Sequence, residues 1–221
     1  MGRYTAVLVE PRQHRAIEFC IRNLIENLDS DWDVLVLHGN LNAEYVRDVV
    51  SKFPEHAARI SMTNLGVDNL VSAEYSQLLA SKAFYHLIPT EVFLITQTDA
   101  MINPNNKDAI HAFLDYDYVG APWNKSWDTE LFGKVGNGGF SLRRKSATLK
   151  VISTEPYRFG CHEDFYFSSS PILKKPSFEA ASYFSSETLW NPKSFGIHKI
   201  WHHLSVDADL VPGLAELKSL Q

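Results

Sequence analysis

The first hundred residues alternate between two hydrophobic patterns, and this alternation limits the possible folds more than any other feature. Short β-rich apolar runs lie at residues 4–9, 33–38, 59–62 and 92–96. Segments with apolar residues at helical spacing lie at 14–28, 42–50 (with Asn42 as a possible N-cap) and 72–87. Strand, helix, strand in such order implies right-handed crossovers. We therefore predict one α/β domain with a central, mainly parallel mixed sheet flanked by helices.

Composition excludes several classes of protein. A chain of 221 residues with 45% hydrophobic residues can bury a core without disulfides. Cys20 and Cys161 form no CxxC pair, which favours a reducing compartment, and we expect a cytoplasmic protein. The 26 acidic and 21 basic residues are scattered, which argues against a nucleic-acid partner. There is no run of about 18 apolar residues, so no membrane span is expected.

Asp99 ends an apolar run in LITQTD, residues 94–99. One interpretation is a carboxylate that caps the following turn. The other is an oxygen ligand for Mg²⁺ or Mn²⁺, because ligands of parallel sheets bind beyond the carboxyl ends of the strands. The residue alone does not decide between them.

Three later segments also carry chemistry. GNGGFSLRR (136–144) is either a glycine-rich turn or a place where the backbone at Gly138 and Gly139 approaches a ligand closely, and it matches neither GxGxxG nor the P-loop. Glu163 and Asp164 either cap a helix or include a carboxylate that accepts a proton from a hydroxyl group. FGIHK (195–199) is either packing or, with Asp99, an Asp/His site for Mn²⁺ beside a phosphate-binding Lys199.

These motifs, in this order, resemble the GT-A class of nucleotide-sugar glycosyltransferases. They are most similar to a group of small, little-characterised glycosyltransferase-like domains. The motifs that carry the resemblance are LITQTD, DYDYVGAPW (115–123), GNGGFSLRR, the Glu163–Asp164 pair and FGIHK. The resemblance covers roughly residues 4–203 and implies a GT-A (Rossmann-like) domain at residues 1–204. Its nucleotide-binding half would span about residues 1–100 and its donor-sugar and acceptor half residues 101–204.

By this resemblance the chain would be a metal-dependent glycosyltransferase of carbohydrate biosynthesis. It would move a sugar from a nucleotide-sugar donor, expected to be a UDP-sugar, to a carbohydrate or other hydroxyl acceptor. Asp99 and His198 would hold Mn²⁺ or Mg²⁺, Lys199 would contact the pyrophosphate, and Asp164 would be the general base of an inverting reaction. The other expected nucleotide and donor contacts are Val9, Glu10, Pro11, Arg12, Gln97, Thr98, Gly138 and Gly139. The expected sugar or acceptor contacts are Trp123, Asn137 and Glu163. The aromatic rings of Trp123, Trp127, Phe140 and Tyr166 offer flat apolar surfaces for sugar rings, with core packing as the other interpretation.

Two departures from the class pattern keep other functions open. Gln97 stands where the first Asp of Asp-x-Asp is usual, and Ile200 stands where proline is common. A catalytically weak or inactive module that binds nucleotide sugars or carbohydrates is one alternative. A metal-dependent nucleotidyltransferase or phosphohydrolase is another, although it would need more carboxylates near Asp99.

The C-terminal residues 205–221 are expected to form a helical tail or linker. Leu210, Leu214 and Leu217 are spaced for one face of a helix. Such a face would dock back on the domain or lead into a further domain.

Overall fold

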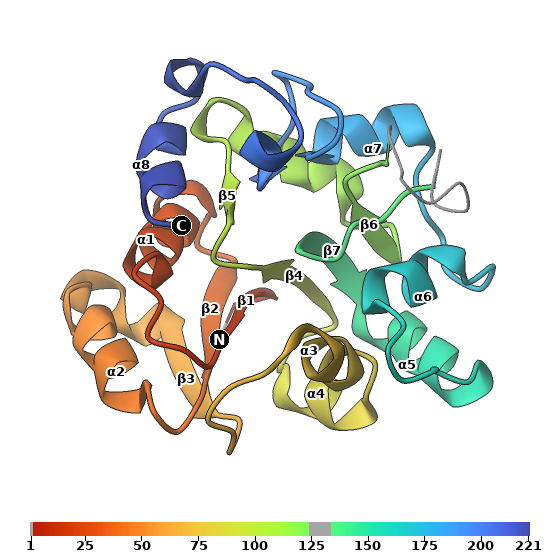
Figure 1. Ribbon diagram of the computed structural model, residues 1–221, viewed down its shortest axis with the longest axis horizontal. Coiled ribbons are helices and arrows are strands. Elements are labelled where there is room, and N and C mark those ends of the chain that lie inside the picture. Colours follow the sequence, from red (N-terminus) through yellow and green to blue (C-terminus); the bar gives the residue numbers. More distant parts are fainter. Residues whose placement is uncertain (1, 124–133) are drawn as a thin grey trace.

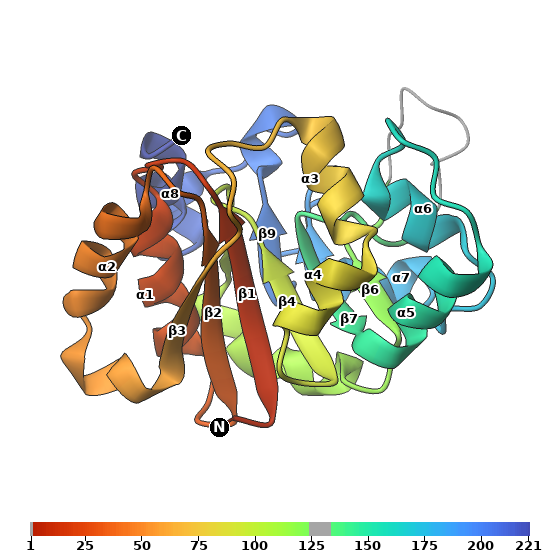
Figure 2. The same cartoon turned by 90° about the horizontal axis from the view of Figure 1, so that it is seen from below.

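A six-stranded mixed sheet forms the centre of the computed structural model, which describes residues 2–123 and 134–221 (Figures 1 and 2). The strand order is β3-β2-β1-β4-β7-β6. The strands are β1 (Tyr4–Glu10), β2 (Trp32–His38), β3 (Ile60–Asn64), β4 (Val92–Thr96), β6 (Tyr118–Gly120) and β7 (Phe140–Arg144). The strands β1 to β4 are parallel, whereas β7 runs antiparallel to β4 and β6 antiparallel to β7. The predicted α/β architecture with a mainly parallel sheet is confirmed.

Each strand supplies apolar side chains alternately to the two faces of the sheet, and each face has its own helices. Val7 of β1 packs under the helices α3 (Ser72–Leu79), α4 (Lys82–Leu87), α5 (Lys145–Thr154) and α6 (Glu163–Ser169). Leu8 packs in the opposite core, which includes α1 (Ile17–Asn27), α2 (Ala43–Ser51), α7 (Phe178–Phe184) and α8 (Leu214–Ser219). Because both faces are covered, the strands read as continuous apolar runs.

A second, three-stranded sheet brings together distant parts of the chain. Its order is β5-β9-β8, with β5 (Ala100–Ile102), β8 (Ser185–Ser186) and β9 (Gly196–His198). Ala100 pairs with His198 in the antiparallel β5–β9 ladder. Since β5 follows β4 after a short turn, this sheet extends the carboxyl edge of the central sheet toward the C-terminal third of the chain. The described residues also form four 3-10 helices: η1 (Pro54–Arg59), η2 (Pro104–Phe113), η3 (Ile200–His202) and η4 (Ala208–Leu210).

Two local predictions need correction. The single helix expected at residues 72–87 is two helices, because Ser81 accepts a hydrogen bond from the backbone of Phe84 and so starts α4 anew. Asn42 does stand at the N-cap of α2, but its side chain makes no capping hydrogen bond. Its amide instead donates to the carbonyl oxygens of Glu10 and Arg12, at 2.8 and 2.7 Å. Asn42 therefore ties down the loop that follows β1.

The C-terminal segment folds back on the domain. Leu214 and Leu217 of α8 are buried in the core beside α1, whereas Leu210 belongs to η4 and is 58% exposed. The guanidinium of Arg15 donates to the carbonyl oxygens of Leu220 and Gln221. The division of the chain at residue 204 and the assignment of its two halves stay predictions. Within the described ranges, no helix has the length and hydropathy to cross a membrane.

Candidate functional site

Asp99 and His198 meet at the carboxyl edge of the central sheet. Pairing of β5 with β9 puts His198 opposite Ala100, and the backbone N–H of Lys199 donates to the carbonyl oxygen of Asp99 at 2.8 Å. As a result, Nε2 of His198 lies 3.2 Å from Oδ1 of Asp99. Burial would lower the pKa of His198, but the neighbouring carboxylates outweigh it and raise that pKa to about 9. Burial would raise the pKa of Asp99, but His198 lowers it to about 2.

Glu187 approaches the other side of the imidazole ring. Its Oε1 lies 3.3 Å from Nδ1 of His198 and 3.6 Å from Nζ of Lys199. The same oxygen accepts a hydrogen bond from the side-chain amide of Asn137 at 3.1 Å. Burial would raise the pKa of Glu187, but His198 and Lys199 lower it. His198 is thus held between two carboxylates.

Lys199 has a backbone conformation that is unusual for a lysine. Its φ is 32°, and it is the only non-glycine residue with positive φ in the described part of the chain. Such a conformation costs roughly 1 kcal/mol for a residue with a β-carbon and persists only where its surroundings impose it. Here the bond to Asp99 and the start of η3 impose it. The turn directs the chain away from β9 immediately after His198.

Because Gly138 and Gly139 have no side chains, neighbouring side chains can pack directly against their backbone. A β-carbon at Gly139 would lie 2.3 Å from Nε2 of His198 and 2.7 Å from Oε1 of Gln97. At Gly138 it would lie 2.2 Å from Oε1 of Glu163. The two glycines therefore separate His198, which packs against Gly139, from the start of α6, which packs against Gly138.

Glu163 and Asp164 begin α6 and face different partners. Oε1 of Glu163 accepts a hydrogen bond of 2.8 Å from Nη2 of Arg143, whose side chain is fully buried against the rings of Tyr118 and Phe167. Asp164 accepts from the backbone N–H groups of Gly138 and Phe165 at 3.3 and 2.7 Å. Burial, followed by the charge of Glu163, raises the pKa of Asp164 to about 6. Asp164 is thus suited to take up a proton near neutral pH.

A cavity of about 280 Å³ opens beside Asp99. It is lined by Val9, Glu10, Pro11, Arg12, Leu70, Ser72, Tyr75, Gln97, Thr98 and Asp99. Glu10 is buried at its floor and forms a two-point ion pair with Arg12, with contacts of 2.8 and 2.7 Å. The cavity is close to the lower size limit of small-molecule sites and lies where parallel sheets usually bind ligands.

The Asp99–His198 pair fits two neighbouring ligand positions of one metal ion. Adjacent ligands of an octahedral Mg²⁺ lie about 3 Å apart, because each is about 2.1 Å from the ion. Oδ1 of Asp99 and Nε2 of His198 match this spacing, and both atoms are buried without a hydrogen-bond partner in the described ranges. No cluster of three or more His, Cys, Asp or Glu side chains suited to a metal occurs in residues 2–123 and 134–221. The described residues would therefore supply two ligands.

Most of the residues predicted from the sequence come together. The segment from Val9 to Arg12 lines one cavity with Gln97, Thr98 and Asp99, and Gly138 and Gly139 connect this edge to Asp164. Trp123 is buried, and its backbone N–H donates to the carbonyl oxygen of Lys134. Trp127 lies outside the described residues. The functional roles of all these residues stay predictions.

Sequence reasoning missed Glu187, the partners of Glu163 and part of the cavity wall. Glu187 is a single acid in the segment SSETLW and has no motif around it. Only the pairing of β8 with β9, which sets Ser186 beside Ile197, brings it to His198. Arg143 stands within GNGGFSLRR, and an arginine in a buried strand was an available sign that a buried acid lies nearby.

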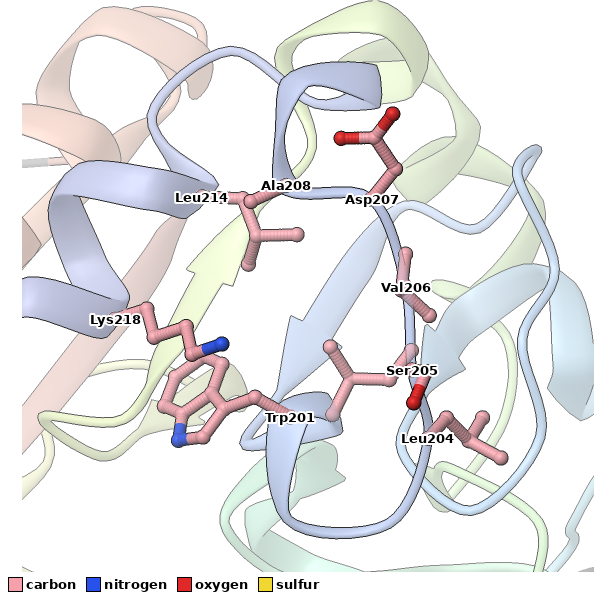
Figure 3. A pocket seen from close by; sticks show the side chains of 9 residues that line it. Trp201, Leu204, Ser205, Val206, Asp207, Ala208, Leu214 and Lys218 are labelled. Carbon is pink, nitrogen blue, oxygen red and sulfur yellow. The ribbon is translucent and has the colours of Figure 1, made fainter.

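A second cavity, of about 340 Å³, lies between η3 and α8 (Figure 3). Its wall includes Trp201 of η3, Asp207, and Leu214 and Lys218 of α8. It shares no lining residue with the cavity beside Asp99.

Comparison with solved structures identifies the fold. The glycosyltransferase GlyE of Streptococcus pneumoniae TIGR4 matches with a TM-score of 0.61 and 13% identity, over 100% of this chain and 60% of that chain. S. aureus TarS 1-349, solved in complex with UDP-GlcNAc, matches with a TM-score of 0.56 and 11% identity, over 95% and 63% of the two chains. The mannosyltransferase PcManGT from Pyrobaculum calidifontis, in complex with GDP-Man and Mn²⁺, gives 0.52 and 14%, over 79% and 54%. The fold is therefore GT-A, and the chain spans less than two thirds of each of these proteins.

Comparison of the sequence with known proteins identifies a family but no curated relative. No curated protein matches the chain. A protein-family profile does match residues 59–198, which include β4, both glycines, Asp164, Glu187 and His198. This match covers more than half of the 221 residues. The chain belongs to the family described as "Protein of unknown function (DUF5672)".

Proposed function

We propose that this protein is a glycosyltransferase that moves a sugar from a nucleotide-sugar donor to a hydroxyl acceptor. The observation that carries the proposal is the Asp99–His198 pair, 3.2 Å apart, whose Asp99 lines a cavity on the carboxyl edge of a GT-A sheet. PcManGT, solved in complex with GDP-Man and Mn²⁺, and TarS, solved in complex with UDP-GlcNAc, share this fold and support a nucleotide-sugar donor. UDP-sugars are the donors we expect first. The cytoplasmic location expected from the two cysteines, which are free, stays a prediction.

The residues that line the cavity would bind the nucleotide. The loop from Val9 to Arg12 is fixed by Asn42 and by the Glu10–Arg12 pair, so it offers a preformed wall for the base and ribose. Gln97 and Thr98 lie on the same wall. In this arrangement the diphosphate of the donor would lie at Asp99, next to Lys199.

Asp99 and His198 would hold a divalent ion, with donor phosphates and water completing its coordination. When bound, Mn²⁺ or Mg²⁺ would neutralise the charge that develops on the departing diphosphate. Lys199 would add a positive charge on the same side, and its left-handed backbone fixes where that charge begins. Both positive charges would stabilise the negative charge on the departing nucleoside diphosphate.

Asp164 would accept the proton of the acceptor hydroxyl. The hydroxyl oxygen then forms a bond to the anomeric carbon, the bond from this carbon to the diphosphate oxygen breaks, and its electron pair leaves with the nucleoside diphosphate. Attack from the face opposite the leaving group would invert the anomeric configuration. The two backbone N–H groups that bond Asp164 hold its carboxylate in place for this step.

Incubation with a panel of UDP- and GDP-sugars and Mn²⁺ tests the proposal. We expect metal-dependent release of nucleoside diphosphate from at least one donor, and loss of metal-dependent donor binding in Asp99→Ala and in His198→Ala. Asp108→Ala, an exposed acid in η2, is the matched control and should behave like the parent. Absence of binding and turnover with every donor would overturn the proposal, and unchanged metal-dependent binding in both site variants would overturn the assignment of the ligands.

A binding module without turnover is the second candidate. It is favoured by the small ligand set, since Gln97 replaces a second carboxylate and the described ranges hold no larger metal cluster. Nucleotide-sugar binding with no transfer or hydrolysis across a broad acceptor panel would support this function over catalysis. Release of inorganic phosphate would instead indicate a phosphohydrolase.

A further inference from the structure

Glu187 is a buried acid next to His198 with several polar contacts, and no motif marks it. It is 2% exposed, and its Oε1 is the shared contact of Nδ1 of His198, Nζ of Lys199 and the amide of Asn137. Nε2 of His203 is 3.9 Å from the same oxygen. One carboxylate oxygen thus contacts a candidate metal ligand, a candidate phosphate contact and the loop that carries both glycines.

The backbone holds Glu187 from both sides. Parallel pairing of Ser186 with Ile197 makes Glu187 the neighbour of His198 one residue further along β8 and β9. Ser186 is fixed by hydrogen bonds to the backbone of Asn191, and the hydroxyl of Thr188 donates to the carbonyl oxygen of Pro122 at 3.3 Å. The carboxylate therefore has little freedom to move away from the imidazole ring.

A carboxylate at Nδ1 decides which nitrogen of a neutral imidazole carries the proton. A carboxylate only accepts hydrogen bonds, so it favours a proton on Nδ1 and leaves the lone pair on Nε2. Nε2 is the nitrogen that faces Asp99, at 3.2 Å. A lone pair on Nε2 that faces a carboxylate needs a cation beside it, and either a proton or a metal ion can take that place. This is the arrangement in which histidine ligates a metal while a second carboxylate orients the ring.

We infer that Glu187 is a positioning residue for metal binding: it fixes the ring and tautomer of His198 so that Nε2, together with Oδ1 of Asp99, presents a two-ligand site for a divalent cation. This inference rests on the proposed function, because it assigns a partner to one of its proposed ligands. Asn137 completes the unit by holding Glu187 and the backbone N–H of Gly139 at the same time.

Titration calorimetry of Mn²⁺ into the UDP-saturated protein tests the inference. Glu187→Gln keeps the size and one acceptor oxygen but removes the charge, and we expect a 10- to 100-fold weaker affinity for Mn²⁺. Affinity for UDP without metal should stay within about twofold of the parent, which a general loss of structure would not permit. Glu179→Gln, an exposed glutamate in α7, is the matched control and should leave both affinities unchanged.

A second measurement reports on the imidazole ring directly. Nitrogen-15 NMR of the histidine rings in the Mg²⁺- and UDP-loaded parent should show the proton of His198 on Nδ1. In Glu187→Gln, which binds less metal at the same Mg²⁺ concentration, a larger share of His198 should carry a proton on Nε2. If Glu187→Gln does not fold, Glu187→Asp keeps the charge but withdraws it by one methylene, and it should also weaken Mn²⁺ binding. Parent-like Mn²⁺ affinity in the folded variant would overturn the role of Glu187 and leave the proposed function intact. A parent that binds UDP but no Mn²⁺ would overturn the metal site itself.

Discussion

Gly139 and His198 are packed so closely that a β-carbon at position 139 would lie 2.3 Å from Nε2 of the imidazole ring. Gly139→Ala must therefore displace His198 or Gln97, whose Oε1 would be 2.7 Å from the new methyl group. We expect at least tenfold weaker metal-dependent donor binding, together with about 1–3 kcal/mol lower free energy of unfolding from overpacking. Calorimetry and urea denaturation measure the two effects.

Gly66→Ala is the control for this substitution. Gly66 has a φ of 72° and nothing within 4 Å of its β-carbon position. Alanine there should cost roughly 1 kcal/mol through backbone strain alone and leave donor binding unchanged. Parent-like binding in Gly139→Ala would show that His198 can move without loss, and would argue against His198 as a ligand.

Local sequence patterns predict the parts of this fold that depend on local physics. The strand at residues 92–96 is predicted with its observed bounds. A short run of β-branched and aromatic residues between polar ends is typical of a strand that is covered on both faces of its sheet. The break between α3 and α4 was missed, since Ser81 acts only through one hydrogen bond to Phe84.

In the candidate site, likewise, residues in local motifs could be predicted from the sequence, whereas those that depend on tertiary contacts could not. Asp99 and the glycines stand in motifs that are visible in the sequence. Glu187 reaches His198 only through a two-residue strand, and 11 positions separate the two residues with no periodic pattern between them. The buried ion pair of Arg143 and Glu163 likewise spans 20 positions. Contacts of this kind follow from tertiary pairing: an arginine in a buried strand indicates that an acid lies nearby, but no local pattern identifies which acid.

Asp164 should link activity and stability to pH. Its pKa is raised to about 6, above the ordinary value of 3.8, first by burial and then by Glu163. Since catalysis would need the ionised form, kcat should rise with pH through a midpoint near 6. Asp164→Asn should lower kcat by about 10²–10⁴-fold and abolish this rise. Asp108→Asn in η2 should leave the pH profile unchanged.

The same substitution should stabilise the fold at neutral pH. An acid whose pKa is raised on folding stabilises the native state below its unfolded pKa, and this contribution is lost as the pH rises through the folded pKa. The ionised Asp164 thus lowers stability above about pH 6. Asp164→Asn should raise the free energy of unfolding by about 1–3 kcal/mol at neutral pH, and the gain should vanish below about pH 4. An equal gain at every pH would contradict the raised pKa.

Arg143 and Glu163 should be strongly coupled in stability. Arg143→Met leaves the Glu163 carboxylate buried without its 2.8 Å partner, and breaking such a pair costs about 3–5 kcal/mol. The double variant Arg143→Met/Glu163→Leu removes both charges and should recover most of that loss. Denaturant unfolding of both variants and of Glu163→Leu completes the cycle. Additive losses in the cycle would show that the two side chains act independently.

Activity of the double variant addresses the predicted sugar contact of Glu163. If Glu163 serves only to hold Arg143 and the start of α6, a folded double variant should retain most of its donor turnover. If Glu163 contacts sugar or acceptor, turnover should fall at least tenfold while stability is restored. The comparison therefore separates packing from contact with substrate at one residue.

Asn42 should affect nucleotide binding, because it fixes the loop that lines the cavity beside Asp99. Its side chain, fully buried, donates to the carbonyl oxygens of Glu10 and Arg12 and accepts from the backbone N–H of Gly39 at 2.8 Å. Asn42→Ala leaves these backbone groups without partners, which should lower the free energy of unfolding by roughly 2–4 kcal/mol. Because the released loop lines the cavity beside Asp99, metal-free UDP affinity should also fall severalfold.

Asn40→Ala provides the comparison for this last prediction, because Asn40 lies two residues away but is exposed. Its amide donates to Oδ1 of Asp68 at 2.9 Å, on the surface, so its loss should change stability by no more than about 0.5 kcal/mol. Comparing the two variants shows whether changes in stability and UDP affinity come from any substitution in the loop after β2 or from loss of the hydrogen bonds to Glu10 and Arg12. If Asn42→Ala is destabilised as expected but binds UDP like the parent, the loop after β1 does not hold the nucleotide, and the base must bind elsewhere along the carboxyl edge.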